Sequence, residues 1–274
     1  MMAPLPYAFN YSTDNWTAGT PTTAPGTILP QVTAVDTMTA DTACIAAIAQ
    51  DCYWIDAQVY STSVAGSDTS ALMDILYDPA GGTAWQILIP KLIVGFTLAR
   101  GNKYSFPLYI PKGSTIGARW QCVTDTLVTP GLILTLYGGP SRPGFWFGTN
   151  VTQVGTNTTG SMGTDIDPGS TGTWGAWTSV GGTTNPAFRY IAFGAQGTAI
   201  THTADVYHVQ YGFGDTKIPG AQSRFVYDTA EAINILPQAT GVYVDIPAGT
   251  QLQARATGSD ATSEDCSVAI YGVS

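Results

Sequence analysis

Charged residues are scarce in this chain, and glutamate is almost missing. Only 11% of the 274 residues are charged, against roughly 25% in ordinary globular proteins, and Glu231 and Glu264 are the only glutamates. Long helices draw on Glu, Lys, Arg, Leu and Ala for propensity and for i,i+4 ion pairs. The composition therefore excludes a helical bundle or coiled coil. It predicts an all-β protein with short strands and turns rich in Gly, Pro, Asn, Asp and Thr.

Cysteine and histidine are also rare. The cysteines at positions 44, 52, 122 and 266 form no C-x₂-C pair, so we expect no zinc site. We interpret them as small buried hydrophobic residues in a reducing compartment, with a Cys44–Cys52 disulfide as the alternative. His202 and His208 are too far apart along a strand to share a metal ion. The D-I-D-P-G sequence at 165–169 lacks the further ligands of a calcium loop and is interpreted as a turn, so we expect no cofactor.

No membrane segment or basic surface is evident. No apolar run approaches the roughly 18 residues of a membrane span, and the opening M-M-A-P-L-P lacks the basic and apolar regions of a signal peptide. The net charge is −9, and no basic stripe is present, which argues against a direct nucleic-acid partner. We therefore expect neither nucleic acid nor a membrane as a partner.

No motif of a known enzyme class occurs. H-E-x-x-H, G-x-S-x-G, Walker A and G-x-G-x-x-G sequences are all missing. Glycoside hydrolases need two carboxylates at a set separation, but the two glutamates lie in dissimilar contexts and the aspartates lie mostly in predicted turns. We expect a protein that is not an enzyme, and a polysaccharide-degrading enzyme is the remote alternative.

What the chain does contain is an internal repeat. Residues 110–119 and 246–255 share the frame I-P-x-G-[ST]-x-[IL]-x-A-R. Further matches keep the same order along the chain: 26–35 with 172–180, 76–80 with 226–230, 87–90 with 234–237, and 134–138 with 268–272. Self-similarity of this kind indicates duplicated structural units. We predict two related antiparallel β-sandwiches in tandem.

The boundaries of these units follow from composition. We place an N-terminal arm at 1–24, the first sandwich at 25–139 and the second at 172–274. The stretch 140–171, rich in Gly and Thr, is interpreted as a linker or long loop. The Ala-rich segment 39–51 is the exception to the β pattern, and it favours a short helix, with a buried strand as the alternative.

The I-P-x-G turn leads into an alternating strand in both copies. Proline sets φ, and glycine supplies the permissive turn position. The apolar residues that follow share one face of each strand, so Arg119 and Arg255 occupy matching sites on the opposite face. Two of only six arginines at matching sites suggest a structural fork that pairs with Asp78 and Asp228. The alternative is that each arginine is simply solvated.

Aromatic residues gather in segments that offer few other core residues. The N-terminal arm is a candidate oligomer clasp, since aromatic groups give large contact areas. The F-W-F run at 145–147 either packs back on a sandwich or is buried in a partner chain. The two tryptophans that open the second unit belong to its core or its rim. The interface and binding candidates are Tyr7, Phe9, Tyr11, Trp16, Phe145, Trp146, Phe147, Trp174 and Trp177.

Two segments carry a family resemblance. The G-T-W-G-A-W-T sequence at 172–178 and the F-P-L-Y-I-P-K-G-S-T-I-G-A-R-W-Q sequence at 106–121 resemble head- and tail-associated structural proteins of tailed bacteriophages. The I-P-x-G strand is the most specific part of the resemblance. Residues 74–78 depart from the family pattern because they lack its Gly-rich continuation. The resemblance implies jelly-roll-like domains and a virion component such as a decoration protein, head spike or tail appendage, and it supplies no catalytic residues.

Composition and resemblance together predict a non-enzymatic structural protein of a bacteriophage virion, assembled in the host cytoplasm. The expected partners are further copies of the chain, as a trimer or higher homo-oligomer, and other virion proteins such as the major capsid protein. The alternative is a module that binds a host surface glycan. Its candidate residues are Trp16, Trp146, Trp174 and Trp177, which we expect to be exposed, because an aromatic ring can stack on a sugar.

Overall fold

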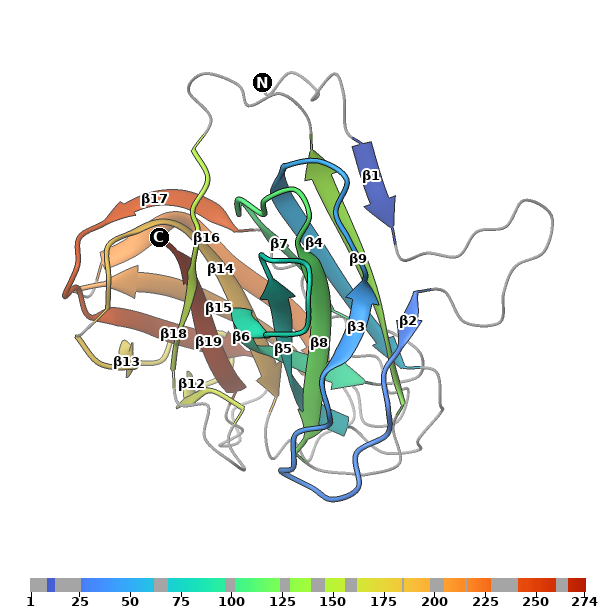
Figure 1. Cartoon of the computed structure of the whole chain (residues 1–274). Coiled ribbons are helices and arrows are strands. Elements are labelled where there is room, and N and C mark those ends of the chain that lie inside the picture. Colours follow the sequence, from blue (N-terminus) through green and yellow to red (C-terminus); the bar gives the residue numbers. More distant parts are fainter. Residues whose placement is uncertain are drawn as a thin grey trace.

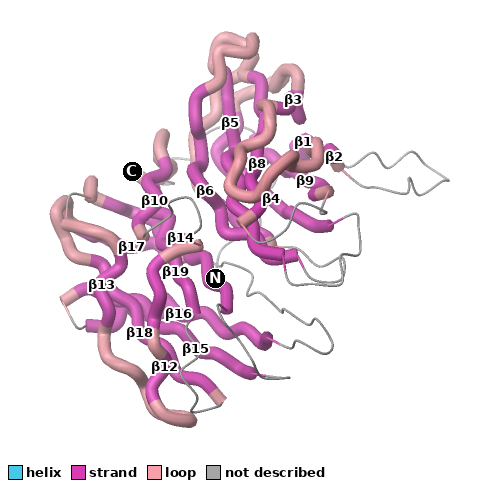
Figure 2. Tube along the Cα trace, turned by 90° about the horizontal axis from the view of Figure 1, so that it is seen from below, coloured by secondary structure: helices cyan, strands magenta, loops and turns pink. Residues whose placement is uncertain are grey.

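All described secondary structure is β. The computed structural model describes residues 9–12, 26–61, 69–96, 102–123, 129–138, 146–155, 162–183, 185–197, 205–214, 216–227, 241–259 and 266–274. Within these ranges the chain forms strands, turns and loops and no helix (Figures 1 and 2). The predicted all-β class is confirmed, and the shortage of helix-forming charged residues accounts for it.

The first half of the chain forms two sheets. One has the order β1-β9-β4-β7, with β2 also paired to β9. Its strands are β1 (Phe9–Ser12), β2 (Thr27–Ile28), β4 (Cys52–Ser61), β7 (Lys103–Phe106) and β9 (Pro130–Gly138). The other has the order β3-β8-β5-β6. Its strands are β3 (Thr42–Ile45), β5 (Thr69–Asp78), β6 (Gln86–Phe96) and β8 (Thr115–Cys122).

The second half also forms two sheets, which Figure 1 shows beside the first half. One has the order β10-β19-β14-β17, with β11 paired to β19. Its strands are β10 (Val151–Val154), β11 (Thr164–Ile166), β14 (Phe188–Gly197), β17 (Val242–Ile246) and β19 (Cys266–Val273). The other has the order β12-β18-β15-β16, with β13 paired to β18. Its strands are β12 (Pro168–Gly169), β13 (Thr178–Val180), β15 (Asp205–Phe213), β16 (Thr216–Tyr227) and β18 (Leu252–Gly258).

The two halves share one topology. Eight strands of each half can be numbered 1 to 8 in chain order. In the first half these are β2 to β9, and in the second half they are β11 and β13 to β19. With this numbering, each half has one sheet in the order 1-8-3-6 and one in the order 2-7-4-5. Eight strands in two facing sheets with this order form a jelly roll. The predicted pair of tandem antiparallel sandwiches is therefore confirmed as a fold class.

The repeated I-P-x-G motif forms the same turn in both halves. Gly113 and Gly249 have φ values of 90° and 77°, a region that glycine enters at little cost. After each turn the hydroxyl of the next residue, Ser114 or Thr250, donates to the proline carbonyl at 2.7 Å. The strands that follow, β8 and β18, bury their alternating apolar residues as predicted.

Two of the other matches within the repeat were wrong, and a third, 87–90 with 234–237, has its second segment outside the described residues. Segment 26–35 contains β2, the first strand of its jelly roll, whereas 172–180 contains β13, a second strand. Residues 76–78 end β5, the fourth strand of its jelly roll, whereas 226–227 end β16, a fifth strand. The fifth strand of the first half is β6, and it matches β16 through a shared Ile-Pro pair, at 89–90 and 218–219. In each strand the next residue, Lys91 or Gly220, has a positive φ, of 43° or 78°. The matches were misplaced because short apolar strings recur by chance in a chain of this composition.

Two segments differ from their expected structure. The Ala-rich segment 39–51 contains β3, which pairs with β8, and no helix. Edge pairing with β8 therefore outweighs the helix propensity of alanine. The stretch 140–171, interpreted as a linker, contributes β10, β11 and β12 to the sheets of the second half. Its low apolar periodicity reflects very short strands.

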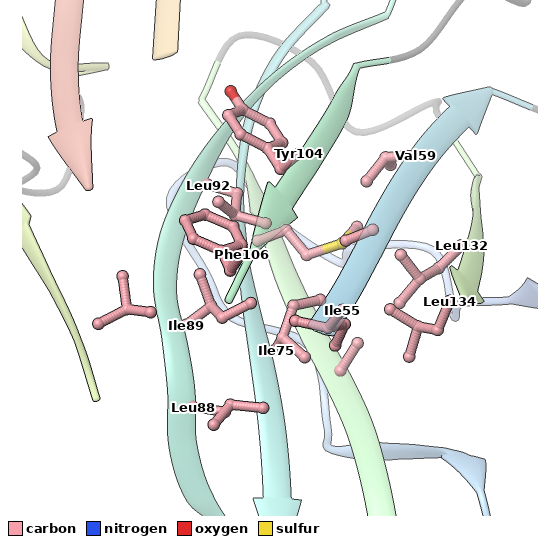
Figure 3. Packing of buried hydrophobic residues seen from close by; sticks show 14 of the residues in the cluster. Ile55, Val59, Ile75, Leu88, Ile89, Leu92, Tyr104, Phe106, Leu132 and Leu134 are labelled. Atoms are coloured by element: carbon pink, nitrogen blue, oxygen red, sulfur yellow. The ribbon is translucent and has the colours of Figure 1, made fainter. Parts of the chain in front are cut away.

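Strand β19 of the second half is buried on both faces, and its sheet joins the two jelly rolls. Every residue of β19 is buried. Its even-numbered residues from Cys266 to Ile270 belong to the core of the second half, whereas Ala269, Tyr271 and Val273 pack with the core of the first half. Figure 3 shows the first-half side of that core, with Tyr104 on β7 near the residues of β6. The β10-β19-β14-β17 sheet is therefore a layer shared by two cores.

Tyr271 forms the central hydrogen bonds of this junction. Its hydroxyl accepts from the backbone N–H of Ile93 at 2.8 Å and donates to the carbonyl of Lys91 at 3.0 Å, both in strand β6. Tyr104 donates to the carbonyl of Ile93 at 2.6 Å, and its ring lies edge-on to Tyr271 with centroids 5.6 Å apart. Burial raises the pKa of both phenols, so each stays a neutral donor.

The junction covers the edge of the first jelly roll. Strands β6 and β7 are the last strands of their sheets, and uncovered edges invite pairing with other chains. Tyr190, on β14, donates to the carbonyl of Ser105 on β7 at 2.9 Å. Gly194, also on β14, leaves space for Tyr104, whose hydroxyl would lie 3.1 Å from a Cβ at that position. The second half thus covers this edge with tyrosines and a small residue.

The corresponding sheet face of the first half is polar. Asp56, buried on β4, accepts hydrogen bonds from Trp54 Nε1 at 2.8 Å, Ser105 Oγ at 2.6 Å and the Tyr137 hydroxyl at 3.1 Å. It also pairs with Lys103 at 2.9 Å. Burial and the Asp56 charge raise the pKa of Tyr137 to about 12. The β1-β9-β4-β7 sheet of the first half therefore presents a charged network, whereas the equivalent β10-β19-β14-β17 sheet of the second half presents tyrosines.

Replacing Tyr271 with phenylalanine is expected to destabilise the protein. The change leaves the buried Ile93 N–H without its partner, and such a loss costs about 1–3 kcal/mol. The free energy of unfolding from urea titration measures the effect. Tyr53→Phe is the control, because the contacts of the Tyr53 ring with Tyr109 and Phe147 survive the change. Equal stability of Tyr271→Phe and wild type would contradict the assigned role.

Candidate interaction surfaces

Arg119 forms an ion pair, but its partner is not Asp78. Its Nε donates to Asp74 Oδ2 at 2.9 Å, and its Nη1 lies 3.7 Å from Asp41 Oδ1. The β5–β8 register places Asp74 opposite Arg119 and Asp78 opposite Thr115. Asp74 and Asp78 lie on the same face of β5, four residues apart. The predicted fork is therefore present with a different carboxylate.

Asp78 instead organises the turn after β5. Its carboxylate accepts from the backbone N–H groups of Ala80 at 2.9 Å, Ala84 at 2.9 Å and Gly82 at 3.0 Å. These hydrogen bonds lower the pKa of Asp78, with the Ala80 N–H as the largest cause. The residue is a local turn anchor. Asp228, its predicted counterpart, lies outside the described residues.

Arg255 has a neutral and aromatic environment. Its Nε and Nη2 donate to Gln210 Oε1 at 3.1 and 2.9 Å. Its guanidinium carbon lies 5.1 Å from the Trp174 ring centroid and 4.6 Å from that of Trp177. Both distances are within the range of cation–π attraction. The structure thus brings together an arginine and two tryptophans that we had predicted separately, and Gln210 is an added partner that the sequence analysis missed.

The outer face around Arg255 is cationic. His208, Lys217 and Arg224 lie on β15 and β16, and the described outward side chains of β15, β16 and β18 include no carboxylate. Burial and the nearby Arg224 lower the pKa of His208, so its imidazole is neutral at pH 7 and the positive charge of this face comes from Lys217, Arg224 and Arg255. Trp174 is 38% exposed. We call Trp174, Trp177, Arg255 and Gln210 the Trp–Arg surface.

The aromatic run at 145–147 packs on its own chain where the structure describes it. Phe147 has its ring centroid 4.8 Å from that of Tyr53 and 5.9 Å from that of Tyr109. Trp146 is half-buried against the core of the first half. Trp146 and Phe147 therefore pack back on the first sandwich, which is one of the two arrangements expected for this run.

The remaining aromatic candidates are described only in part. Tyr7, Trp16 and Phe145 lie outside the described residues. Phe9 and Tyr11 lie in β1, which pairs with β9 over Phe9↔Gly138 to Ser12↔Thr135, and their side chains are outside the description. The role of the arm as a clasp stays a prediction.

The cysteines and acidic residues form no metal site in the described part of the chain. No group of three His, Cys, Asp or Glu residues is placed to hold a metal ion there. All four cysteines are free thiols, so the alternative Cys44–Cys52 disulfide does not form. Burial raises the pKa of Cys44 and of Cys52 to about 11. The interpretation of 165–169 as a turn was wrong, because 165–166 and 168–169 belong to β11 and β12, which pair with β19 and β18. Asp165 accepts from Ser267 Oγ at 2.6 Å. No helix among the described residues is long and apolar enough to cross a membrane.

Comparisons with known proteins show only distant likeness. No protein-family model and no curated protein matches the chain. A chain of broad bean stain virus has 10% identity and a TM-score of 0.37, covering 90% of this chain and 86% of its own. A chain of the T=1 Penaeus vannamei nodavirus has 10% identity and a TM-score of 0.30, with coverages of 90% and 95%. PNGase F, a glycosylasparaginase from Flavobacterium meningosepticum, has 9% identity and a TM-score of 0.41, with coverages of 97% and 96%. Two of these three are chains of virus structures and one is an enzyme, so the likeness assigns no function.

Removing the two matched arginines is expected to have unequal effects on stability. Arg119→Met leaves the buried Asp74 carboxylate without its ion pair and should cost roughly 2–3 kcal/mol. Arg255→Met leaves a neutral glutamine and should cost less, on the order of 1 kcal/mol. Urea unfolding of both variants provides the comparison. Adding Asp74→Asn to Arg119→Met should recover part of the loss, and an equal cost for both arginines would refute this account.

Replacing Asp78 with asparagine is expected to lower stability in a pH-dependent way. The folded state lowers the pKa of Asp78, so its contribution is present above the unfolded value, about 4, and disappears as pH falls through the folded pKa. Asp78→Asn should therefore be less stable than wild type at pH 7, and the difference should narrow at acid pH. Asp245→Asn, at an exposed position on β17, is the control. A difference that stays constant from pH 7 to pH 2 would rule out the charge as the cause.

Proposed function

We propose that the chain is a non-enzymatic structural protein of a bacteriophage particle, where it decorates the capsid or forms part of a head spike or tail appendage. The observation that carries the proposal is the Trp–Arg surface on the cationic outer face of the second jelly roll. The resemblance of residues 106–121 and 172–178 to tailed-phage structural proteins supports the same conclusion.

The surface has the composition of a binding hot spot. Tryptophan and arginine are the residue types most enriched among side chains that dominate interface energies. Gln210 and the two indole rings hold the Arg255 guanidinium in one orientation, which lowers the entropy cost of binding. A cationic face on a chain of net charge −9 complements an anionic partner surface. A second copy of the chain or an acidic capsid protein offers such a surface.

The junction between the halves supports a presenting role. The β10-β19-β14-β17 sheet of the second half is covered by the first half, whereas the β12-β18-β15-β16 sheet carries the Trp–Arg surface. One jelly roll therefore holds the other with this face outward. A rigid two-domain unit of this kind suits a particle component that contacts neighbours on a defined side.

Disrupting the Trp–Arg surface is expected to prevent assembly without unfolding the chain. Trp174→Ala combined with Arg255→Gln removes two candidate hot-spot groups, and each such group is worth about 2 kcal/mol or more. Incorporation into phage particles should fall by at least tenfold. Mass spectrometry of purified particles measures incorporation, and sedimentation of the pure protein measures self-association.

The matched control is Val35→Ala, which trims an apolar side chain of similar exposure on the first half, 41% against 38% for Trp174. This variant should incorporate normally. Two results would contradict the proposal: wild-type protein that is absent from particles and remains monomeric, or a double variant that incorporates as well as wild type.

The exposed ring of Trp174 also favours a second candidate function, binding of a host glycan. An aromatic face beside amide and guanidinium groups can stack on a sugar and bond to its hydroxyls. A glycan array probed with wild type and Trp174→Ala tests this role. Binding that Trp174→Ala abolishes would support it, and an array with no binding would exclude it for the glycans present.

A further inference from the structure

A cleft lies between the two halves. The cleft has a volume of about 580 Å³, within the range of ligand pockets. Strands β5, β6 and β8 of the first half form one side, and β10 of the second half forms the other. The lining residues used below are Asp74, Ile87, Arg119, Gln121, Val151 and Gln153.

Gln121 has an unused donor in this cleft. The residue is only 4% exposed, and its Nε2 has no hydrogen-bond partner among the described residues. A buried donor without a partner is costly, and native structures rarely leave one. Because Gln121 also lines the cleft, a ligand with an oxygen acceptor would satisfy this amide.

The charged residues at the cleft balance as two carboxylates, Asp41 and Asp74, and two cations, Lys91 and Arg119. Asp74 accepts from the Lys91 backbone N–H at 2.8 Å and from Arg119 at 2.9 Å. Arg119 in turn lies between Asp74 and Asp41. A charged ligand would have to compete with these pairs, whereas an uncharged ligand leaves them intact. The cleft is therefore suited to a neutral ligand.

Most of the remaining lining is aliphatic, with Lys91, Thr152 and Gln153 as the exceptions. Ile87 is 46% exposed there, and Met38, Pro90 and Val151 are its apolar companions. The described residues of the lining include no aromatic ring, which disfavours the stacking that sugars prefer. An aliphatic side chain fits this surface better than a sugar ring.

One strand at the cleft also has a free edge within the described part of the molecule. There, β10 pairs only with β19, through Val151↔Val273 to Val154↔Ile270. An extended segment can add to such an edge through main-chain hydrogen bonds. Gln153 Nε2 donates to the Gly155 carbonyl at 3.3 Å, and its Oε1 can accept from a main-chain N–H.

The geometry points to this cleft as a binding site for a short, uncharged, extended peptide segment of another protein chain. A main-chain carbonyl of the segment accepts from Gln121 Nε2, and an apolar side chain packs on Ile87 and Val151. The site is separate from the Trp–Arg surface and does not rest on the proposed virion role.

The test is selection of peptides on the full-length protein. A phage-displayed library of heptapeptides without Asp, Glu, Lys or Arg is panned on wild type, and synthetic copies of enriched peptides are measured by fluorescence anisotropy. Gln121→Leu removes the unpaired amide at similar volume, so it should keep or raise the melting temperature. The same change should weaken peptide binding by about tenfold, the equivalent of one hydrogen bond.

Gln50→Leu is the matched control, because Gln50 Nε2 is also buried without a partner but does not line the cleft. This variant should bind peptide as wild type does. Ile87→Ala, at an exposed position, gives a second reading if Gln121→Leu fails to fold, and it should weaken binding several-fold. Failure to enrich any peptide, or equal binding by wild type and both cleft variants, overturns the proposal. Glycan-array binding that Gln121→Leu abolishes overturns it in favour of a saccharide. The Trp174→Ala variant should still bind peptide, so failure of peptide binding and failure of particle assembly are distinguishable results.

Discussion

Burial of strand β19 on both of its faces is the constraint on which the rest of the structure depends. Strand β19 contributes alternate side chains to two cores, so its sequence must satisfy two packing environments at once. Tyr271 is the residue where this demand is strongest, because its hydroxyl completes the backbone hydrogen bonding of the first half's edge strand. The orientation of the two jelly rolls, the cleft between them and the exposure of the opposite sheet all follow from this contact.

Divergence between the two jelly rolls is clearest at their matched arginines. Arg119 and Arg255 lie on equivalent strands and face Asp74 and Gln210 across equivalent pairs. A carboxylate partner neutralises the first guanidinium, whereas an amide leaves the second with its charge, which two indole rings then share. One topology thus supports a charge-neutral cleft wall in one half and a cationic outer face in the other.

Local features of the fold were predictable from the sequence, whereas features set by pairing between distant segments were not. The I-P-x-G turn and the alternation of β8 and β18 follow from residue type and neighbour spacing. The choice of Asp74 over Asp78 depends on strand register, because both carboxylates lie on the same face of β5. Gln121 shares the face of Arg119 on β8, and its burial at the cleft between the halves depends on packing that the strand pattern does not specify. The Trp–Arg surface combined residues that are about 80 positions apart, so only tertiary structure could unite them.

The junction joins an edge of one jelly roll to a face of the other, and this geometry determines how further jelly rolls would add through the same contact. An edge of one jelly roll meets a face of the next, so the contact is head-to-tail and lacks a two-fold axis; repeated without closure, it would generate an open filament. The first jelly roll has the same kind of face, but there Asp56 and Lys103 replace the tyrosines. Docking another edge on that face would desolvate the ion pair. Addition of a third jelly roll at that face would therefore carry an electrostatic cost that the tyrosines spare the junction within the chain.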